Sequence, residues 1–372
     1  MKWLFLSSGL FLGWTLGAND AANLFGTAVG TRMIKFRTAA LVASAFVIIG
    51  AVSGGAGTTR TLGRLGAIDA PAGAFGVALA AGLAVVLLLT RIGLPVSITQ
   101  AIVGAILGWN LFTGRPTDVR TLGQLLSSWL VSPLVAGLTG ATLFVLLRKA
   151  IPRLKTHLLK EDALTRASLL AVGAFAAYGL GVNDIANVMG VFVRSSPFPD
   201  AISFGPVTFT SVQMLFLLGG LSIAAGIVTY SERIMKRVGS GLTSLSPLAA
   251  LIVVLSAGTV LFLFGSQELQ GVLRAAGLPG WPLVPVSATQ AVVGAILGIS
   301  FVRKSGIRTR ALSEIAVGWA AAPVAAMVFS LVGLFVLQNV FELPVSTTPP
   351  RRSAASSPPA VPAPSPGAPP VR

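Results

Sequence analysis

The chain has 372 residues, of which 54% are hydrophobic and only 10% are charged, and its mean hydropathy is +0.84. About a quarter of the residues of a water-soluble globular protein are charged, so this composition excludes a soluble globule and predicts an integral membrane protein. The net charge of +16 does not indicate a nucleic-acid partner, because the basic residues are spread over the connections between apolar segments instead of forming one basic domain.

Ten apolar runs approach or exceed the roughly 20 residues that a helix needs to cross a bilayer. In chain order they are residues 3–29, 38–57, 71–90, 94–113, 121–147, 167–193, 203–230, 247–267, 281–302 and 311–340. Five runs fall in each half, which predicts an all-α, multi-pass membrane protein built from two repeats. The expected domains are a first repeat (1–149), a basic linker (150–166), a second repeat (167–340) and a disordered tail rich in Pro, Ser and Ala (341–372).

Lysine and arginine are distributed unequally between the connections. The connections that follow odd-numbered segments hold 17 of them, and those that follow even-numbered segments hold 6. Cytoplasmic connections carry the excess of positive charge, so the odd connections are predicted to be cytoplasmic and both termini to face outward. Five crossings per repeat then reverse the orientation of the second repeat, which predicts inverted repeats.

The first polar motif is Leu-Gly-Ala-Asn-Asp-Ala-Ala-Asn at residues 16–23, and it recurs as Leu-Gly-Val-Asn-Asp-Ile-Ala-Asn at residues 180–187. It places Asp20 or Asp184 within an apolar segment, where a carboxylate is costly and usually faces a cavity or a partner. Each Asp shares a helix face with the Asn three residues later, which offers oxygens to Na⁺ and amide N–H groups to an oxyanion. The candidate Na⁺ ligands are Asn19, Asp20, Asn23, Asn183, Asp184 and Asn187.

Glycine precedes each of these motifs, as Gly17 and Gly181. Both are expected to break their helices and free backbone carbonyls for a cation. Close packing between helices is the alternative role for glycine in membrane segments.

The second polar motif, Pro-Val-Ser-Ile-Thr-Gln, begins at Pro95, and residues 95–108 match residues 285–298 at all but two positions. Proline suits the first turn of a helix and Ser and Thr are capping residues, so a broken or re-entrant helix is expected to start at each copy. A helix N-terminus at membrane depth attracts anions, and two such ends could face each other across the midplane. The hydroxyl and amide donors are Ser97, Thr99, Gln100, Ser287, Thr289 and Gln290.

A third repeated element places Trp129 and Pro133 in the first half and Trp319 and Pro323 in the second. Each tryptophan lies 30 residues after the threonine of the preceding Pro-Val-Ser motif. Packing around a helix kink is favoured over substrate contact for this element.

The charges of the two polar motifs indicate the mechanism. An anion held beside two carboxylates would be repelled by several kcal/mol per close pair. The motifs contain no Lys or Arg, so the compensating charge is expected to be a bound Na⁺ or H⁺. Obligatory binding of a cation together with an anion is symport.

With these residues in view, the chain resembles the inorganic phosphate transporter family, whose signature Gly-Ala-Asn-Asp-x-Ala-Asn stands at residues 17–23 and, with Val182, at 181–187. The resemblance covers about residues 1–340. It implies secondary transport of phosphate coupled to Na⁺ or H⁺, inverted repeats and a homodimer. It also implies that phosphate is held by Asp20, Asn23, Asp184, Asn187 and the Ser, Thr and Gln side chains of the helix starts.

This sequence departs from the family where many members carry His, at Gln100 and Gln290. The loss of an imidazole favours Na⁺ over H⁺ as the coupling ion, although the two aspartates themselves remain alternative proton carriers. Sulfate or another tetrahedral oxyanion is the alternative substrate. No nucleophile, base and orienting group occur together, so no enzyme activity and no cofactor are expected. The expected location is the plasma membrane of a prokaryote.

Overall fold

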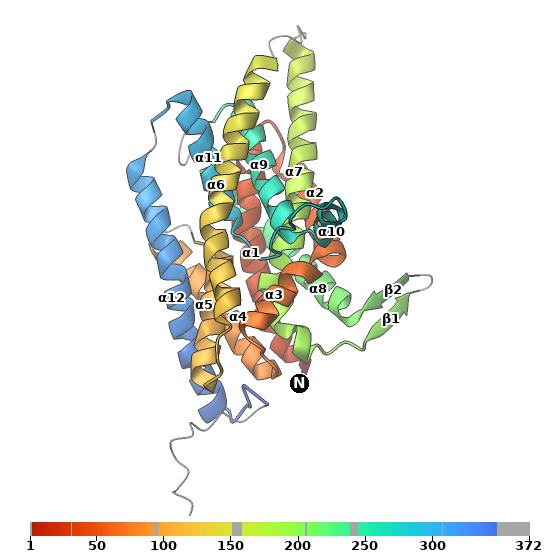
Figure 1. Cartoon of the computed structure of the whole chain (residues 1–372), viewed down its shortest axis with the longest axis vertical. Coiled ribbons are helices and arrows are strands. Elements are labelled where there is room, and N and C mark those ends of the chain that lie inside the picture. Colours follow the sequence, from red (N-terminus) through yellow and green to blue (C-terminus); the bar gives the residue numbers. More distant parts are fainter. Residues whose placement is uncertain are drawn as a thin grey trace, which may run out of the picture.

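The computed structural model describes residues 2–30, 32–92, 96–150, 158–204, 207–238, 245–306 and 308–347. The protein is an elongated bundle of helices (Figure 1), which confirms the all-α prediction. The first half contains α1 (Lys2–Gly30), α2 (Phe36–Gly54), α3 (Ala56–Leu65), α4 (Pro71–Leu87), the π-helical turn η1 (Leu88–Ile92), α5 (Ile98–Thr113) and α6 (Val119–Ala150). The second half contains α7 (Leu158–Met189), the 3-10 helix η3 (Gly190–Ser195), β1 (Ala201–Phe204), β2 (Val207–Thr210), α8 (Ser211–Val238), α9 (Pro247–Gly265), α10 (Gln267–Ala275), α11 (Ala288–Arg303) and α12 (Thr309–Asn339).

Each of the ten expected apolar segments contains a helix. Within the described residues, seven helices are long and apolar enough to cross a membrane, so the protein is a multi-pass membrane protein. The helices that follow the Pro-Val-Ser motifs, α5 and α11, are apolar but have only 16 residues each, fewer than a straight crossing requires. In Figure 1, α11 lies toward the upper end of the bundle and α5 toward the lower end.

Three segments differ from the expectations. The start of the expected segment 203–230 forms part of an antiparallel hairpin, in which Ala201 pairs with Thr210. Helix α7 begins at Leu158, inside the expected linker. Residues 341–347, expected to belong to a disordered tail, pack on the bundle and bury Val345. The rest of that tail, 348–372, lies outside the described residues, as do 151–157 of the linker.

The two halves exchange packing partners. Helix α1 packs against α8 while α2 packs against α7, and α5 packs against α12 while α6 packs against α11. Glycine allows α5 to approach α12 closely, and α11 to approach α6. A Cβ added to Gly104 would lie 2.1 Å from the carbonyl oxygen of Pro323, and one added to Gly294 would lie 2.1 Å from that of Pro133. The Trp/Pro element of each half is thereby seated on the short helix of the other half.

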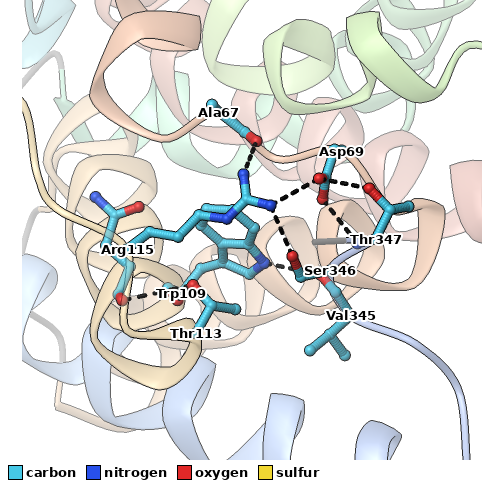
Figure 2. Close-up of polar contacts among 9 residues, drawn as sticks. Ala67, Asp69, Trp109, Thr113, Arg115, Val345, Ser346 and Thr347 are labelled. Atoms are coloured by element: carbon cyan, nitrogen blue, oxygen red, sulfur yellow. Dashed lines mark hydrogen bonds and ion pairs between the residues drawn. The ribbon is translucent and has the colours of Figure 1, made fainter. Parts of the chain in front are cut away.

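A polar cluster fastens the segment after α12 to the first half (Figure 2). Arg115 donates to Asp69 Oδ2 at 2.7 Å and to Ser346 Oγ at 2.8 Å, and its guanidinium lies 5.0 Å from the ring centre of Trp109. Thr347 donates to Asp69 through its amide and its hydroxyl. The cluster therefore ties the loop before α4, the end of α5 and the chain after α12 to one another.

Candidate functional site

Helices α1 and α7 run without interruption through the Asn-Asp motifs, so the helix breaks expected at Gly17 and Gly181 are not found. These glycines serve close packing instead. An added Cβ would come 1.9 Å from the carbonyl oxygen of Ile223 at Gly17, and 2.2 Å from that of Val47 at Gly181. The motifs therefore present side chains from continuous helices, and irregular backbone occurs before α5 and α11.

Asp184 lies in the interior of the bundle and is 1% exposed. Its Oδ1 accepts hydrogen bonds from Asn183 at 2.8 Å and from Asn187 at 2.9 Å. Its Oδ2 and the Oδ1 of Asn187 are buried and have no hydrogen-bond partner among the described residues. Buried acceptor oxygens without donors are uncommon in proteins, and one of these two belongs to a carboxylate, so both atoms are candidate ligands for a cation.

Asp20 occupies the equivalent place on α1 and is 4% exposed. Its Oδ1 accepts a hydrogen bond of 2.9 Å from Asn19 and one of 3.4 Å from Thr289. Thr289 belongs to the start of α11, and the backbone of Val286, three residues before it, exchanges hydrogen bonds with Asn183. The two motifs, far apart in the sequence, therefore meet at one acidic centre.

The Pro-Val-Ser motifs start helices as predicted. Ser97 and Ser287 are the N-caps of α5 and α11, and their hydroxyl oxygens accept from the backbone amides of Gln100 at 3.4 Å and Gln290 at 3.3 Å. Both serines are buried, at 1% and 2% exposed. Pro95 itself lies outside the described residues.

Each helix start binds the Asn-Asp motif of the opposite half. Asn187 donates to Thr99 Oγ1 at 2.9 Å, and Asn23 donates to Thr289 Oγ1 at 3.3 Å. Within the second half, Asn183 also holds the backbone of Val286, accepting from its amide at 3.1 Å and donating to its carbonyl at 2.7 Å. Two helix N-termini, each the positive end of a helix dipole, are thereby joined to the acidic centre.

Gln100 and Gln290, the remaining expected substrate-binding residues, lie in the first turns of the same two helices and are buried. Gln100 and Gln290 line a largely apolar groove of about 1160 Å³ between α6, α11 and α12. Their Oε1 atoms are buried without a partner among the described residues. The same groove is lined by Trp129 and Trp319, whose indole nitrogens also have no partner there.

Sequence reasoning missed two contributors to the acidic centre. One is the backbone of Val286, which no side-chain pattern reports. The other is Thr58 in α3, whose hydroxyl donates to the carbonyl of Val182 at 3.3 Å and is fully buried. The sequence did contain a feature that could have indicated this contact: two hydroxyl residues, Thr58 and Thr59, directly follow the apolar segment 38–57.

Comparison with known proteins gives consistent results. The phosphate transporter family matches residues 16–330. A protein of Methanocaldococcus jannaschii that is provisionally named a phosphate permease is 28% identical, covering 87% of this chain and 93% of its own. One of Haemophilus influenzae with the same provisional name is 26% identical, covering 92% and 97%. Among solved structures, "The sodium-dependent phosphate transporter" is 24% identical, with a TM-score of 0.70, and the match covers 91% of this chain and 98% of that one.

Proposed function

This chain belongs to the phosphate transporter family, and on that premise we propose that it carries inorganic phosphate across the plasma membrane of a prokaryote by cation-coupled symport. The relatives reported above are archaeal and bacterial. The members that match it are permeases, so the protein is a transporter and not an enzyme.

One observation carries the proposal: the two helix N-termini and the two buried aspartates occupy the same centre. The N-termini and the hydroxyls of Thr99 and Thr289 offer positive potential to an anion. The aspartates repel that anion unless a cation neutralises them. Binding of phosphate and cation is therefore interdependent, which is the physical basis of coupling.

We propose Na⁺ as the coupling ion. Asp184 Oδ2 and Asn187 Oδ1 would be its first ligands, because they are buried hard oxygens without hydrogen-bond donors. Asn19, Asp20, Asn23 and Asn183 are the further candidate ligands. A proton carried by Asp20 or Asp184 is the alternative.

Alternating access would use the two halves as inverted repeats. The exchange of packing partners between the halves supports this arrangement, because a repeat related by a two-fold axis must repeat each contact. Phosphate would move between the two sides while α5 and α11 rock around the acidic centre. A homodimer, as the family resemblance implies, is part of the proposal and is tested by the mass of the purified protein in detergent.

Phosphate is favoured over sulfate by the same two aspartates. A protonated phosphate can donate a hydrogen bond to a carboxylate, whereas sulfate at neutral pH has no proton to donate. Uptake of radiolabelled phosphate into proteoliposomes under an imposed Na⁺ gradient tests the proposal. Arsenate should compete and sulfate should not; competition by sulfate at equal concentration would transfer the function to the alternative substrate.

A further inference from the structure

A second cavity, of about 300 Å³, lies between α3 and the end of α7 with its continuation η3. Three arginines line it: Arg60 and Arg64 from α3, and Arg194 from η3. The remaining lining contains Thr59, glycines and aliphatic residues, and it includes no carboxylate. We call this cavity the arginine pocket. Its volume is at the lower end of the roughly 300–1,000 Å³ typical of small-ligand sites.

Among the described residues, no carboxylate is in direct contact with an arginine of the arginine pocket. Within the described residues, none of the three arginines takes part in a recorded salt bridge, whereas Arg115 at the same end of the bundle is paired with Asp69. Asp118 is close enough to Arg64 to sense its charge, but the oxygens of Asp118 accept hydrogen bonds from Arg120 and Thr121 at the start of α6.

The spacing of two of these arginines brings like charges together, and a bound anion would relieve their repulsion. Arg60 and Arg64 are four residues apart on α3, where like charges destabilise a helix. Arg64 and Arg194 lie in the last turns of their helices, where a cation is favourable with the helix dipole. That structural role does not extend to Arg60, in the middle of α3, nor does it explain why all three line one cavity.

The position of these arginines in the sequence is equally unusual. The charge count leaves only 6 basic residues in the connections expected to face outward, and Arg60, Arg64 and Arg194 are three of them. Half of the exceptions to the positive-inside tendency therefore line a single pocket. An anion on the outer side is the ligand that such a cluster fits.

The arginine pocket adjoins the acidic centre. Gly190, in its wall, is the first residue of η3, which continues α7, and it follows Asn187 of α7 by three residues. The lining residue Thr59 is the neighbour of Thr58, which binds the carbonyl of Val182 beside Asn183. The wall of the pocket thus includes residues close in sequence to Asn187, which binds the helix start at Thr99, and to Thr58, which binds the carbonyl of Val182.

We propose that the arginine pocket is an outer capture site, which binds inorganic phosphate from outside and passes it to the acidic centre. This inference rests on the proposed function. The arginines raise the local concentration of the doubly charged anion, and the absence of a carboxylate lets it enter before any cation is bound. Exposure of the arginines keeps the binding weak, so the anion leaves the pocket easily.

The first test neutralises the arginine pocket in the whole transporter. The variant Arg60→Gln/Arg64→Gln/Arg194→Gln should raise KM for phosphate uptake about tenfold with little change in kcat, since a charged cleft accelerates encounter by about 10-fold or more. The kcat/KM of wild-type uptake should fall as the ionic strength rises, whereas the kcat/KM of the variant should stay constant. Arg120→Gln/Arg274→Gln, which removes two charges expected on the same side but outside the pocket, is the control.

The second test uses the absence of cysteine from the chain. In Arg60→Cys, a membrane-impermeant thiosulfonate bearing trimethylammonium should restore KM, and one bearing sulfonate should raise it further. Phosphate added outside should slow the labelling. A lipid phosphate group has the same chemistry, so both tests are run in vesicles of phosphatidylcholine alone and in vesicles that also contain phosphatidylglycerol.

The outcomes separate the alternatives. If the wild type takes up phosphate but the triple variant keeps its KM, or the control variant shifts KM equally, the capture site is refuted. An effect confined to vesicles containing phosphatidylglycerol, without protection by phosphate, would assign the pocket to a lipid headgroup and also overturn the proposal. Failure of wild-type uptake under every gradient would instead refute the proposed function.

Discussion

Asn187 on α7 donates a hydrogen bond of 2.9 Å to Thr99 at the start of α5, and this bond joins the two halves of the chain inside the acidic centre. The equivalent bond from Asn23 to Thr289 is longer, at 3.3 Å. Asn187 is fully buried, whereas Asn23 is partly exposed. The two arms of the centre are therefore alike in connectivity and different in access to solvent.

Replacing either aspartate should abolish coupled uptake. Asp20→Asn and Asp184→Asn keep the side-chain volume and remove the charge that requires a cation. A buried, hydrogen-bonded charge contributes about 2–5 kcal/mol, so uptake should fall about 30-fold or more. Uptake of radiolabelled phosphate measures this effect. The control is Asp162→Asn, which changes an exposed carboxylate on α7, the helix of Asp184. Near wild-type uptake with unchanged cation dependence in either variant would disprove the assignment of the site.

Removing the hydroxyl of Thr99 should weaken phosphate binding. Thr99→Val keeps the shape but deprives the amide of Asn187 of one acceptor and the anion of one donor, a loss of about 1–3 kcal/mol. KM for phosphate should rise roughly tenfold. The control is Thr139→Val on α6, where the hydroxyl donates only to a carbonyl of its own helix. Equal KM values for the two variants would show that the Thr99 hydroxyl has no part in binding.

Sodium should drive accumulation. At fixed pH and with a protonophore present, replacing Na⁺ by K⁺ should stop uphill phosphate uptake, because K⁺ is too large for a site fitted to Na⁺ and carries no proton. The measurement is phosphate accumulation in proteoliposomes. Persistent uphill uptake in Na⁺-free vesicles with a pH gradient would transfer the coupling role to protons on Asp20 and Asp184.

The polar cluster around Arg115 should make stability depend on pH. Burial raises the pKa of Asp69, but hydrogen bonds from Thr347 and Arg115 outweigh it and lower the pKa from 3.8 to about 2. A lowered pKa means that the ionised form stabilises the fold, fully above pH 3.8 and progressively less as the pH falls toward 2. The contribution is about 1–2 kcal/mol once solvent screening is allowed for.

Asp69→Asn should therefore lower Tm in detergent at pH 7 by a few degrees, and the difference from wild type should shrink as the pH falls below 3.8. Asp162→Asn breaks an exposed ion pair of little energetic weight and should leave Tm unchanged at both pH values. A pH-independent difference between Asp69→Asn and wild type would refute the electrostatic explanation.

Topology is tested by labelling single cysteines introduced into this cysteine-free chain. Arg120→Cys, at the start of α6, should react with an impermeant thiol reagent in intact cells. Lys160→Cys, at the start of α7, should react only after permeabilisation, since the charge count places the connection between α6 and α7 in the cytoplasm. The reverse pattern of labelling would invert the whole assignment.

Duplication made much of the acidic centre predictable. Both Asn-Asp motifs and both Pro-Val-Ser motifs were found as repeats, and the helix starts at Ile98 and Ala288 follow from proline and capping serine in an apolar sequence. The cross-links between opposite halves could not be predicted, because no local pattern says which helix start meets which aspartate. Hydrogen bonds such as that of Asn187 to Thr99 depend on tertiary packing.

The glycines show where local reasoning failed. Gly17 and Gly181 were expected to free backbone carbonyls, yet each lies in a continuous helix against the backbone of a neighbour. Glycine before a polar cluster permits both a break and a close approach, and only the positions of α8 and α2 decide between them. The side chains of Gln100 and Gln290 line the groove between α6, α11 and α12, which no local pattern indicated, and their part in substrate binding stays a prediction.

The exchange of packing partners has a consequence for how the protein is made. Helix α5 is synthesised early, but the helix against which it packs, α12, begins only at Thr309 and is synthesised much later. The indole of Trp109 on α5 likewise has no acceptor for its hydrogen bond until Val345, whose carbonyl accepts it, has been synthesised. A chain halted after its first half would hold a polar helix start and Asp20 in the bilayer without their partners, a species open to membrane proteases and insertion chaperones. Correct assembly thus requires that residues synthesised late supply the packing and hydrogen-bond partners of residues inserted early.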